Sequence, residues 1–228
     1  MTNLDELRRE IDGIDDQLLT LLGRRIEIGR AVARSKAPNG GPFLRPGREA
    51  AILRRLSAAA PAAIAPAVIS RIWRQILVAN LAQQTAVTVA TTGVPGPILA
   101  RDHFGVSAEV HVLADGRAVI EAVAAGDALV GVISCDGAWW QDLCNGDTLS
   151  DQPRVIARLP FFGPADMGQA VVVAGFDSDP SGDDISLYAV SDDAGQTLRE
   201  VAGHAEDADH RAPAGGRWLG SYARPSHR

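Results

Sequence analysis

Residues 4–36 form the segment that most limits how this chain can fold. They contain no proline and repeat apolar residues at the spacing of an α-helix. The segment ends at APNGGP, residues 37–42, whose prolines and adjacent glycines stop a helix. At 1.5 Å per residue, the predicted helix is about 50 Å long. A helix of that length in a small protein needs a partner along its whole apolar face.

Two cations share the apolar face of this predicted helix. Arg25 lies about 20° from the centre of that face and Lys36 almost on it, while Arg8 lies near its edge at about 80°. Each has an ordinary explanation, because Lys36 suits a helix C-terminus and Arg25 can extend to solvent. A buried cation needs an anion, however, and no carboxylate on this face matches Arg25 or Lys36, so a ligand could supply it. The apolar residues, within about 40° of Leu18 on a helical wheel, are Leu7, Ile11, Ile14, Leu18, Leu22 and Val32.

Arg8 and Arg25 are too far apart on one helix to bind the same small ligand. Their separation along the axis is about 25 Å. If both serve one site, Arg8 must come from a second copy of the helix that runs antiparallel to the first. A two-fold dimer of this kind would contain two equal sites, and it would supply the partner that the long helix needs.

Two shorter helices are predicted after the first, so that residues 1–84 form an all-α, three-helix domain. One begins near Pro46, a residue suited to the first turn of a helix, and the other covers about 63–84. Polar side chains occupy unusual places in both, although a solvated first turn or a polar helix end would also explain them. They are Arg48 and Glu49 at the start of the second helix, and Asn80 and Gln84 at the end of the third.

The character of the sequence changes after the third helix. Short β-rich segments alternate with helical ones between residues 86 and 134, which indicates an α/β unit with a parallel sheet. Further strands are predicted up to residue 190. From 192 to 228 no periodicity is visible, so we expect a flexible tail there. The predicted organisation is therefore the helical domain, a smaller α/β domain at 86–191, and the tail.

The composition disfavours several classes of protein. The net charge of −6 is unlike the basic footprint of a nucleic-acid binder. No apolar run approaches the roughly 20 residues of a membrane span, and the first residues lack a signal-peptide core, so we expect a cytoplasmic protein. Cys135 and Cys144 are expected to be reduced thiols, and without nearby histidines they do not make a metal site.

Taken in chain order, these residues resemble the all-helical, or type II, chorismate mutases over about residues 4–84. The resemblance implies an intertwined homodimer and the rearrangement of chorismate to prephenate, a step toward phenylalanine and tyrosine. This unimolecular pericyclic reaction needs no acid–base pair, metal or cofactor, only a held conformer and stabilised charge. The motifs that carry the resemblance are LRREID with Arg8, LLGRRIEIGRAVARSK with Arg25 and Lys36, PGREAAIL with Arg48 and Glu49, and ANLAQQ with Gln84.

The resemblance also implies roles for the charged residues. Arg25 and the partner subunit's Arg8 would pair the two substrate carboxylates, for which the fork of arginine is well suited. Lys36 and Gln84 would be the catalytic groups, because both would donate hydrogen bonds to the ether oxygen as its bond breaks.

The end of the site that binds the ring hydroxyl departs from the family pattern. Glu49 would bind the hydroxyl, with Arg48 nearby. The family commonly has Asp three residues before this pair, where the chain has Arg45, and often Ser where it has Asn80. Arg45 could be a loop contact, an extra ligand for a carboxylate, or a solvated side chain.

Residues 86–190 faintly resemble the prephenate dehydratase domain that follows a chorismate mutase in bifunctional enzymes. The similar segments are VTVATTGVPGPILARDHFG, GRAVIEAVAAGDALVGVIS and SLYAV. The Thr-Arg-Phe motif of that family is replaced by GQAVVVAG at 168–175, and its early Gly-Thr-Phe pattern is missing. We therefore expect a degenerate domain that has lost dehydratase chemistry.

Three other functions remain open at this point. An isochorismate-pyruvate lyase shares the helical fold and much of the cationic pocket, although the dehydratase-like domain favours the mutase. A non-catalytic regulator could bind chorismate or an amino acid, but the retained polar residues argue against it. A purely structural helical dimer would require all of these placements to be incidental.

Overall fold

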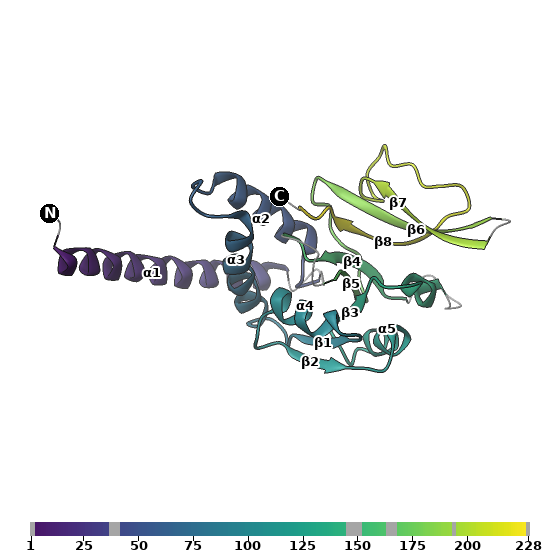
Figure 1. The fold of residues 1–228 in the computed structure, drawn as a ribbon, viewed down its shortest axis with the longest axis horizontal. Helices are drawn as coiled ribbons and strands as arrows, with labels where there is room; N and C mark the ends of the chain where they lie inside the picture. Colours follow the sequence, from purple (N-terminus) through teal and green to yellow (C-terminus); the bar gives the residue numbers. More distant parts are fainter. Residues whose placement is uncertain (1–2, 37–41, 145–151, 163–167, 193–194, 227–228) are drawn as a thin grey trace.

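A long helix projects from a body of two shorter helices and a mixed sheet (Figure 1). The three N-terminal helices are α1 (Leu4–Lys36), α2 (Pro46–Ala59) and α3 (Pro66–Leu81), which confirms the predicted order of elements. The structure, a computed structural model, describes residues 3–36, 42–144, 152–162, 168–192 and 195–226.

A mixed α/β region follows the helices. Its strands form a sheet, eight-stranded within the described residues, in the order β2-β1-β3-β5-β4-β8-β6-β7. The first three strands are parallel, as predicted, and β5 continues the sheet antiparallel to β3 and β4. The elements are β1 (Thr88–Thr91), α4 (Pro95–Phe104), β2 (Glu109–Val112), α5 (Gly116–Ala124), β3 (Val130–Ser134), the 3-10 helix η2 (Trp139–Cys144), β4 (Arg154–Leu159), β5 (Ala170–Ala174), β6 (Asp184–Asp192), β7 (Gly195–Ala202) and β8 (Arg217–Ala223).

Apolar clusters cover both faces of the central strands. Val132 of β3 packs in the cluster of α4, whereas its neighbour Ile133 packs in the cluster of α5. Successive side chains of a strand point to opposite faces, so the two helices cover opposite sides of the sheet. This double coverage explains why β5 reads as an unbroken apolar run and is buried at every position.

The helical region is packed onto the sheet rather than tethered to it. Leu44 and Leu81 lie in the same buried cluster as α4. Leu53 of α2, which is fully buried, packs with Phe161 and Ala223 at the ends of β4 and β8. The two halves of the chain therefore share a core.

The described residues between 192 and 226 include two strands and do not form the flexible tail expected from the sequence, which corrects that expectation. β6 pairs with β7, and β8 pairs with β6 and, through Gly220, with β4. Tyr222 of β8 is fully buried. The apolar pattern is weak because β7 is largely exposed and β8 buries Ser221, which is hydrogen-bonded to Ser186 at 2.8 Å. The α/β region thus extends beyond 191 and is larger than the helical one.

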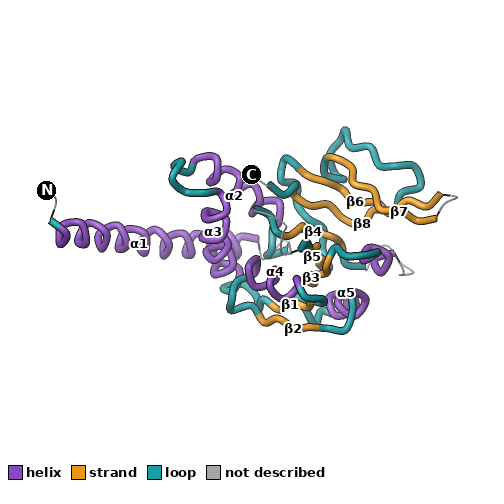
Figure 2. Tube along the Cα trace, in the orientation of Figure 1, coloured by secondary structure: helices purple, strands orange, loops and turns teal. Residues whose placement is uncertain are grey.

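The long helix α1 contacts the body only toward its C-terminal end, beside α3 (Figure 2). The rest of its predicted apolar face is open in the single chain, with exposed fractions of 44–57% at Leu7, Ile11, Ile14 and Leu18. The intertwined homodimer therefore stays a prediction. Among the described residues, no helix has the length and apolar character needed to cross a membrane.

We predict that Leu53→Ala lowers the free energy of unfolding by about 2–5 kcal/mol, because it leaves a cavity between α2 and the sheet. Urea denaturation followed by circular dichroism measures the change. Val94→Ala is the control, since Val94 is 85% exposed and its truncation should change stability by less than about 0.5 kcal/mol. An equally small effect at Leu53 would show that α2 does not dock on the sheet in solution.

Candidate active site

One cavity gathers polar side chains from all three N-terminal helices. Its volume is about 330 Å³, within the range of small-molecule sites. Apolar side chains such as Ile28, Val32 and Phe43 form part of its wall. The lining also includes six of the residues singled out in the sequence: Arg25, Arg45, Arg48, Glu49, Asn80 and Gln84.

Arg25 of α1 lies half-buried in the wall of this cavity. Burial lowers the pKa of its guanidinium from the ordinary value, and the charge of Glu49 opposes that shift. Arg25 forms no hydrogen bond or ion pair with any residue that the structure describes, so its donors are available to a ligand. One turn later, Gly29 lets α1 approach α3 closely, because a Cβ there would overlap the side chain of Asn80.

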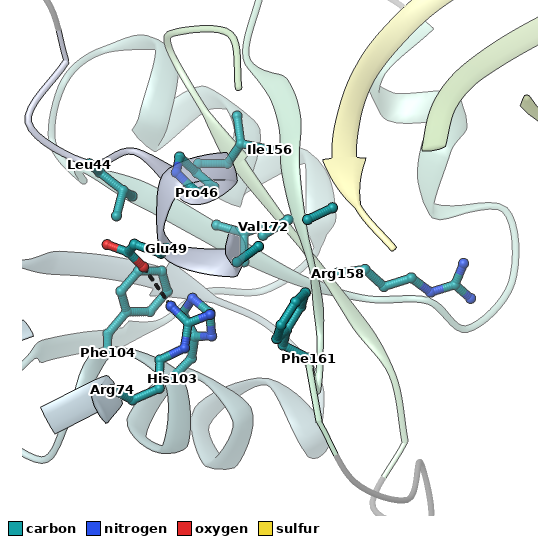
Figure 3. A pocket seen from close by; sticks show the side chains of 13 residues that line it. Leu44, Pro46, Glu49, Arg74, His103, Phe104, Ile156, Arg158, Phe161 and Val172 are labelled. Carbon is teal, nitrogen blue, oxygen red and sulfur yellow. Dashed lines mark hydrogen bonds and ion pairs between the residues drawn. The ribbon is translucent and has the colours of Figure 1, made fainter. Parts of the chain in front are cut away.

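Glu49 of α2 is held by a buried arginine from α3. Arg74 donates to Glu49 Oε2 at 2.5 Å, and Figure 3 shows the two side chains pointing toward one another. Burial raises the pKa of Glu49 and lowers that of Arg74, and the pairing counteracts both shifts. Arg74 also lies 6.0 Å from the ring centroid of Phe161, which joins the pair to the sheet region.

The space around Arg74 is a packed interface. The cavity drawn in Figure 3, between α2, α3, α4 and the sheet, has a volume of about 20 Å³, enough for about one water molecule. His103 of α4 lines it, and burial together with the charge of Arg74 holds the pKa of His103 well below its usual range. His103 is therefore neutral near pH 7, and Glu49 is the carboxylate that pairs with Arg74.

Arg74 was not singled out from the sequence, although a signal was present. It lies on the buried face of α3, at helical spacing from Ser70, Leu77 and Val78. A cation there is as unusual as Arg25 on α1. The same argument, applied to the third helix, would have found it.

Arg45 is a loop contact that also lines the cavity. Its guanidinium lies 3.2 Å from Asp179, a residue of the loop between β5 and β6. Of the three possibilities left open for Arg45, a fully solvated side chain is ruled out.

At the end of α3, Gln84 and Asn80 are joined. Gln84 Nε2 donates to the backbone carbonyl of Asn80 at 3.1 Å. Asn80 Oδ1 is buried and has no hydrogen-bond partner among the described residues. Asn80 Oδ1 packs against Gly29 of α1, so the amide group with a free donor in this part of the wall is that of Gln84, which keeps a second N–H.

Two predicted residues are absent from the described lining of this cavity. Arg8 lies at the far end of α1, where it is exposed and 3.5 Å from Asp5. Lys36 is the last residue of α1, one turn beyond the lining residue Val32, and its side chain lies outside the described part of the structure. Because α1 is continuous, Arg8 and Arg25 are as far apart along the helix axis as the sequence predicted.

Comparison with known protein families finds a match in the helical region. Residues 7–85 match the family model of chorismate mutase type II. We call these residues the type II mutase region; they include nearly all of α1 and the whole of α2 and α3. The family expected from the sequence motifs is therefore confirmed for this part of the chain.

Individual relatives cover different shares of the chain. The bifunctional chorismate mutase/prephenate dehydratase of Pseudomonas aeruginosa is 30% identical over 143 residues, 59% of this chain and 39% of that protein. The intracellular chorismate mutase of Mycobacterium tuberculosis is 36% identical over 58 residues, 25% of this chain and 55% of that protein. The 4-amino-4-deoxychorismate mutase of Streptomyces venezuelae is 44% identical over 45 residues, 20% of this chain and 44% of that protein. The chain thus spans between 39% and 55% of the length of these relatives.

We predict that Arg74→Met lowers the free energy of unfolding by about 3–5 kcal/mol, because it leaves the Glu49 carboxylate buried without its partner. The double variant Glu49→Gln/Arg74→Met should recover much of that loss. Arg71→Met is the matched control on the same helix: its ion pair with Asp102 is exposed, so the expected change is below about 1 kcal/mol. Urea titrations of the wild type, the two single variants and the double variant measure these changes. Equal losses of unfolding free energy in Arg71→Met and Arg74→Met would contradict the prediction.

Proposed function

We propose that this protein is a chorismate mutase that rearranges chorismate to prephenate in aromatic amino acid biosynthesis. One observation carries the proposal: a single cavity within the type II mutase region is lined by Arg25, Glu49 and Gln84, residues far apart in the sequence. They are the residue types that the family motifs imply for binding the substrate carboxylates, the ring hydroxyl and the ether oxygen.

The charge of the cavity supports a dianionic substrate. Its described lining contains three arginines, Arg25, Arg45 and Arg48, against the single carboxylate of Glu49. Arg45 is partly neutralised by Asp179, whereas Arg25 forms no ion pair with any described residue. The guanidinium groups would lose water when a substrate enters the cavity. Its two carboxylates would then replace that water with charge-assisted hydrogen bonds.

Glu49 is suited to accept a hydrogen bond from the ring hydroxyl. Among the described residues only Arg74 donates to its carboxylate, and it does so at Oε2, so Oε1 can accept from the substrate. Arg74 also favours the ionised form that accepting requires, although burial opposes it. We assign Arg74 the role of orienting Glu49 without touching the substrate.

Hydrogen bonds to the ether oxygen would accelerate the rearrangement itself. Negative charge develops there as the C–O bond breaks, and Lys36 and Gln84 would donate to it. Gln84 uses one amide hydrogen on the Asn80 carbonyl and keeps the other for the substrate. No proton is transferred, so no general acid or base is required.

The complete site is proposed to need a second copy of the chain. The open apolar stripe of α1 would pack against the antiparallel α1 of the partner, and this arrangement would bring the partner subunit's Arg8 to the cavity that contains Arg25. The stripe and the cavity lie on the same face of α1, which makes the interface continuous with the site.

The α/β region is proposed to descend from a prephenate dehydratase domain without retaining its reaction. The alignment with the Pseudomonas aeruginosa bifunctional protein covers 59% of the chain and therefore extends beyond the helices. Residues 168–175 read GQAVVVAG where that family has its Thr-Arg-Phe motif, and the described part of this segment is mostly the buried strand β5.

We predict that the purified protein consumes chorismate and forms prephenate, which acid converts to phenylpyruvate. Lys36→Ala and Arg25→Ala should each lower kcat/KM by about 100-fold or more, since each removes a charged donor from the transition state. Arg24→Ala, at an exposed position beside Arg25, is the control and should keep full activity.

The same assay, run with isochorismate and 4-amino-4-deoxychorismate, separates the alternatives. Release of pyruvate from isochorismate would indicate the lyase. Preference for the amino compound would indicate the substrate named for the Streptomyces venezuelae relative. A folded protein that converts none of the three would contradict the proposed function.

We predict that Arg8→Ala and Arg25→Ala complement one another across the dimer. Two differently tagged chains, one with each substitution, are co-expressed and the heterodimer is isolated. If Arg8 acts on the site of the partner, one of the two sites is intact and about half of the wild-type activity returns. If both arginines act within one chain, the heterodimer stays as inactive as either homodimer. Sedimentation at micromolar concentration tests whether the chain forms the expected dimer.

A further inference from the structure

The N-terminus of α2 is capped by a residue from the α/β region. Asp179 accepts hydrogen bonds from the backbone N–H groups of Gly47 and Arg48, both at 3.0 Å, through its two carboxylate oxygens. These are the second and third residues of the helix, whose N–H groups a capping side chain ordinarily satisfies. Asp179 lies 131 positions after Arg48 in the sequence.

The sequence of α2 does not provide this cap itself. The residue at the capping position is Arg45, whose side chain forms no capping hydrogen bond. Its positive charge is also unfavourable at a helix N-terminus. Asp179 compensates for both defects, because its carboxylate binds the N–H groups and pairs with Arg45 at 3.2 Å. By contrast, α5 is capped from its own sequence by Asp115, which accepts from Ala118 N.

The fit between the loop and the helix is close. Gly47 is buried, and a Cβ at this position would overlap the backbone carbonyl oxygen of Asp179. The side chain of Asp179 is only 14% exposed. A few residues along the same loop, the hydroxyl of Ser181 accepts from Arg54 of α2 at 2.9 Å. The loop between β5 and β6 therefore holds α2 at its N-terminus and again at Arg54, more than two turns further along the helix.

The capped turn carries two residues of the candidate site. Arg48 donates its backbone N–H to Asp179, and Glu49 follows directly, while both side chains line the cavity. Asp179 itself does not line it. We propose that Asp179 is a positioning residue of the mutase site: it caps α2 from the other half of the chain and so places Arg48 and Glu49 toward the substrate. This inference rests on the proposed function and gives the α/β region a part in it.

The test compares full-length Asp179→Ala and Asp179→Asn with the wild type in steady-state kinetics on chorismate. Because Arg48 and Glu49 bind the substrate and do not act on the ether oxygen, KM should rise on the order of tenfold in Asp179→Ala, with kcat within about twofold. Asp179→Asn keeps one acceptor oxygen, so its KM should lie between those of the wild type and Asp179→Ala.

A rescue variant separates positioning from general stability. Arg45→Asp combined with Asp179→Ala places a carboxylate at the capping position of α2 itself. Because Arg45 also lines the cavity, this variant is judged by amide protection of the first turn of α2, which should recover, and not by KM. Asp183→Ala is the matched control: this aspartate of the same loop pairs with Arg54 and Arg224, away from the helix N-terminus, and its loss should leave KM unchanged. An unchanged KM in Asp179→Ala, an equal rise in Asp183→Ala, or no recovery of amide protection in the rescue variant would overturn the proposal.

Amide hydrogen exchange provides a readout that is independent of catalysis. The peptide covering the first turn of α2 should exchange faster in Asp179→Ala than in the wild type, and the rescue variant should restore protection. Absence of turnover in the wild type would contradict the proposed function alone, and exchange would still decide whether Asp179 holds the helix. Unchanged exchange together with wild-type turnover would overturn the inference and leave the mutase intact.

Discussion

The docking of α2 between α3 and the sheet is the contact on which the candidate site depends. Leu53 packs against the ends of β4 and β8, and Arg54 donates to the backbone carbonyls of Asp183 and Arg224. Since α2 also carries Arg48 and Glu49, the way that α2 docks on the sheet determines where these two residues lie in the cavity. The type II mutase region is therefore a distinct stretch of sequence, but its packing against the α/β region contributes to the stability of both regions.

The electrostatic design of the site follows from this packing. Glu49 and Arg74 are both removed from water, so neither can turn away without leaving an unpaired buried charge. That constraint fixes the orientation of Glu49, whereas Arg25 has donors that no described residue uses. A cavity with one restrained carboxylate and an excess of guanidinium groups favours an anionic ligand that also bears a hydroxyl, and it disfavours a neutral or cationic one.

Much of the fold and of the site could be predicted from local pattern. The bounds of α1, the parallel strands β1 to β3 and the unusual positions of Arg25 and Glu49 all depend on spacing over a few residues. The C-terminal strands could not be found in this way. β7 is a largely exposed edge strand, and β8 buries Ser221 by hydrogen bonding rather than by apolar packing, so hydrophobic periodicity is weak in both.

The sequence by itself determined which side chains we propose for the chemistry, because helical periodicity assigns Arg25 and Lys36 to an apolar face whatever surrounds it. Only the tertiary structure decided how that chemistry is held in place. The pairing of Glu49 with Arg74 and the capping of α2 by Asp179 join residues from separate elements, and no local preference specifies such partners. The physical reason is that orphan helix N–H groups and buried charges must be satisfied by something, but any segment that the fold brings within hydrogen-bond distance can satisfy them.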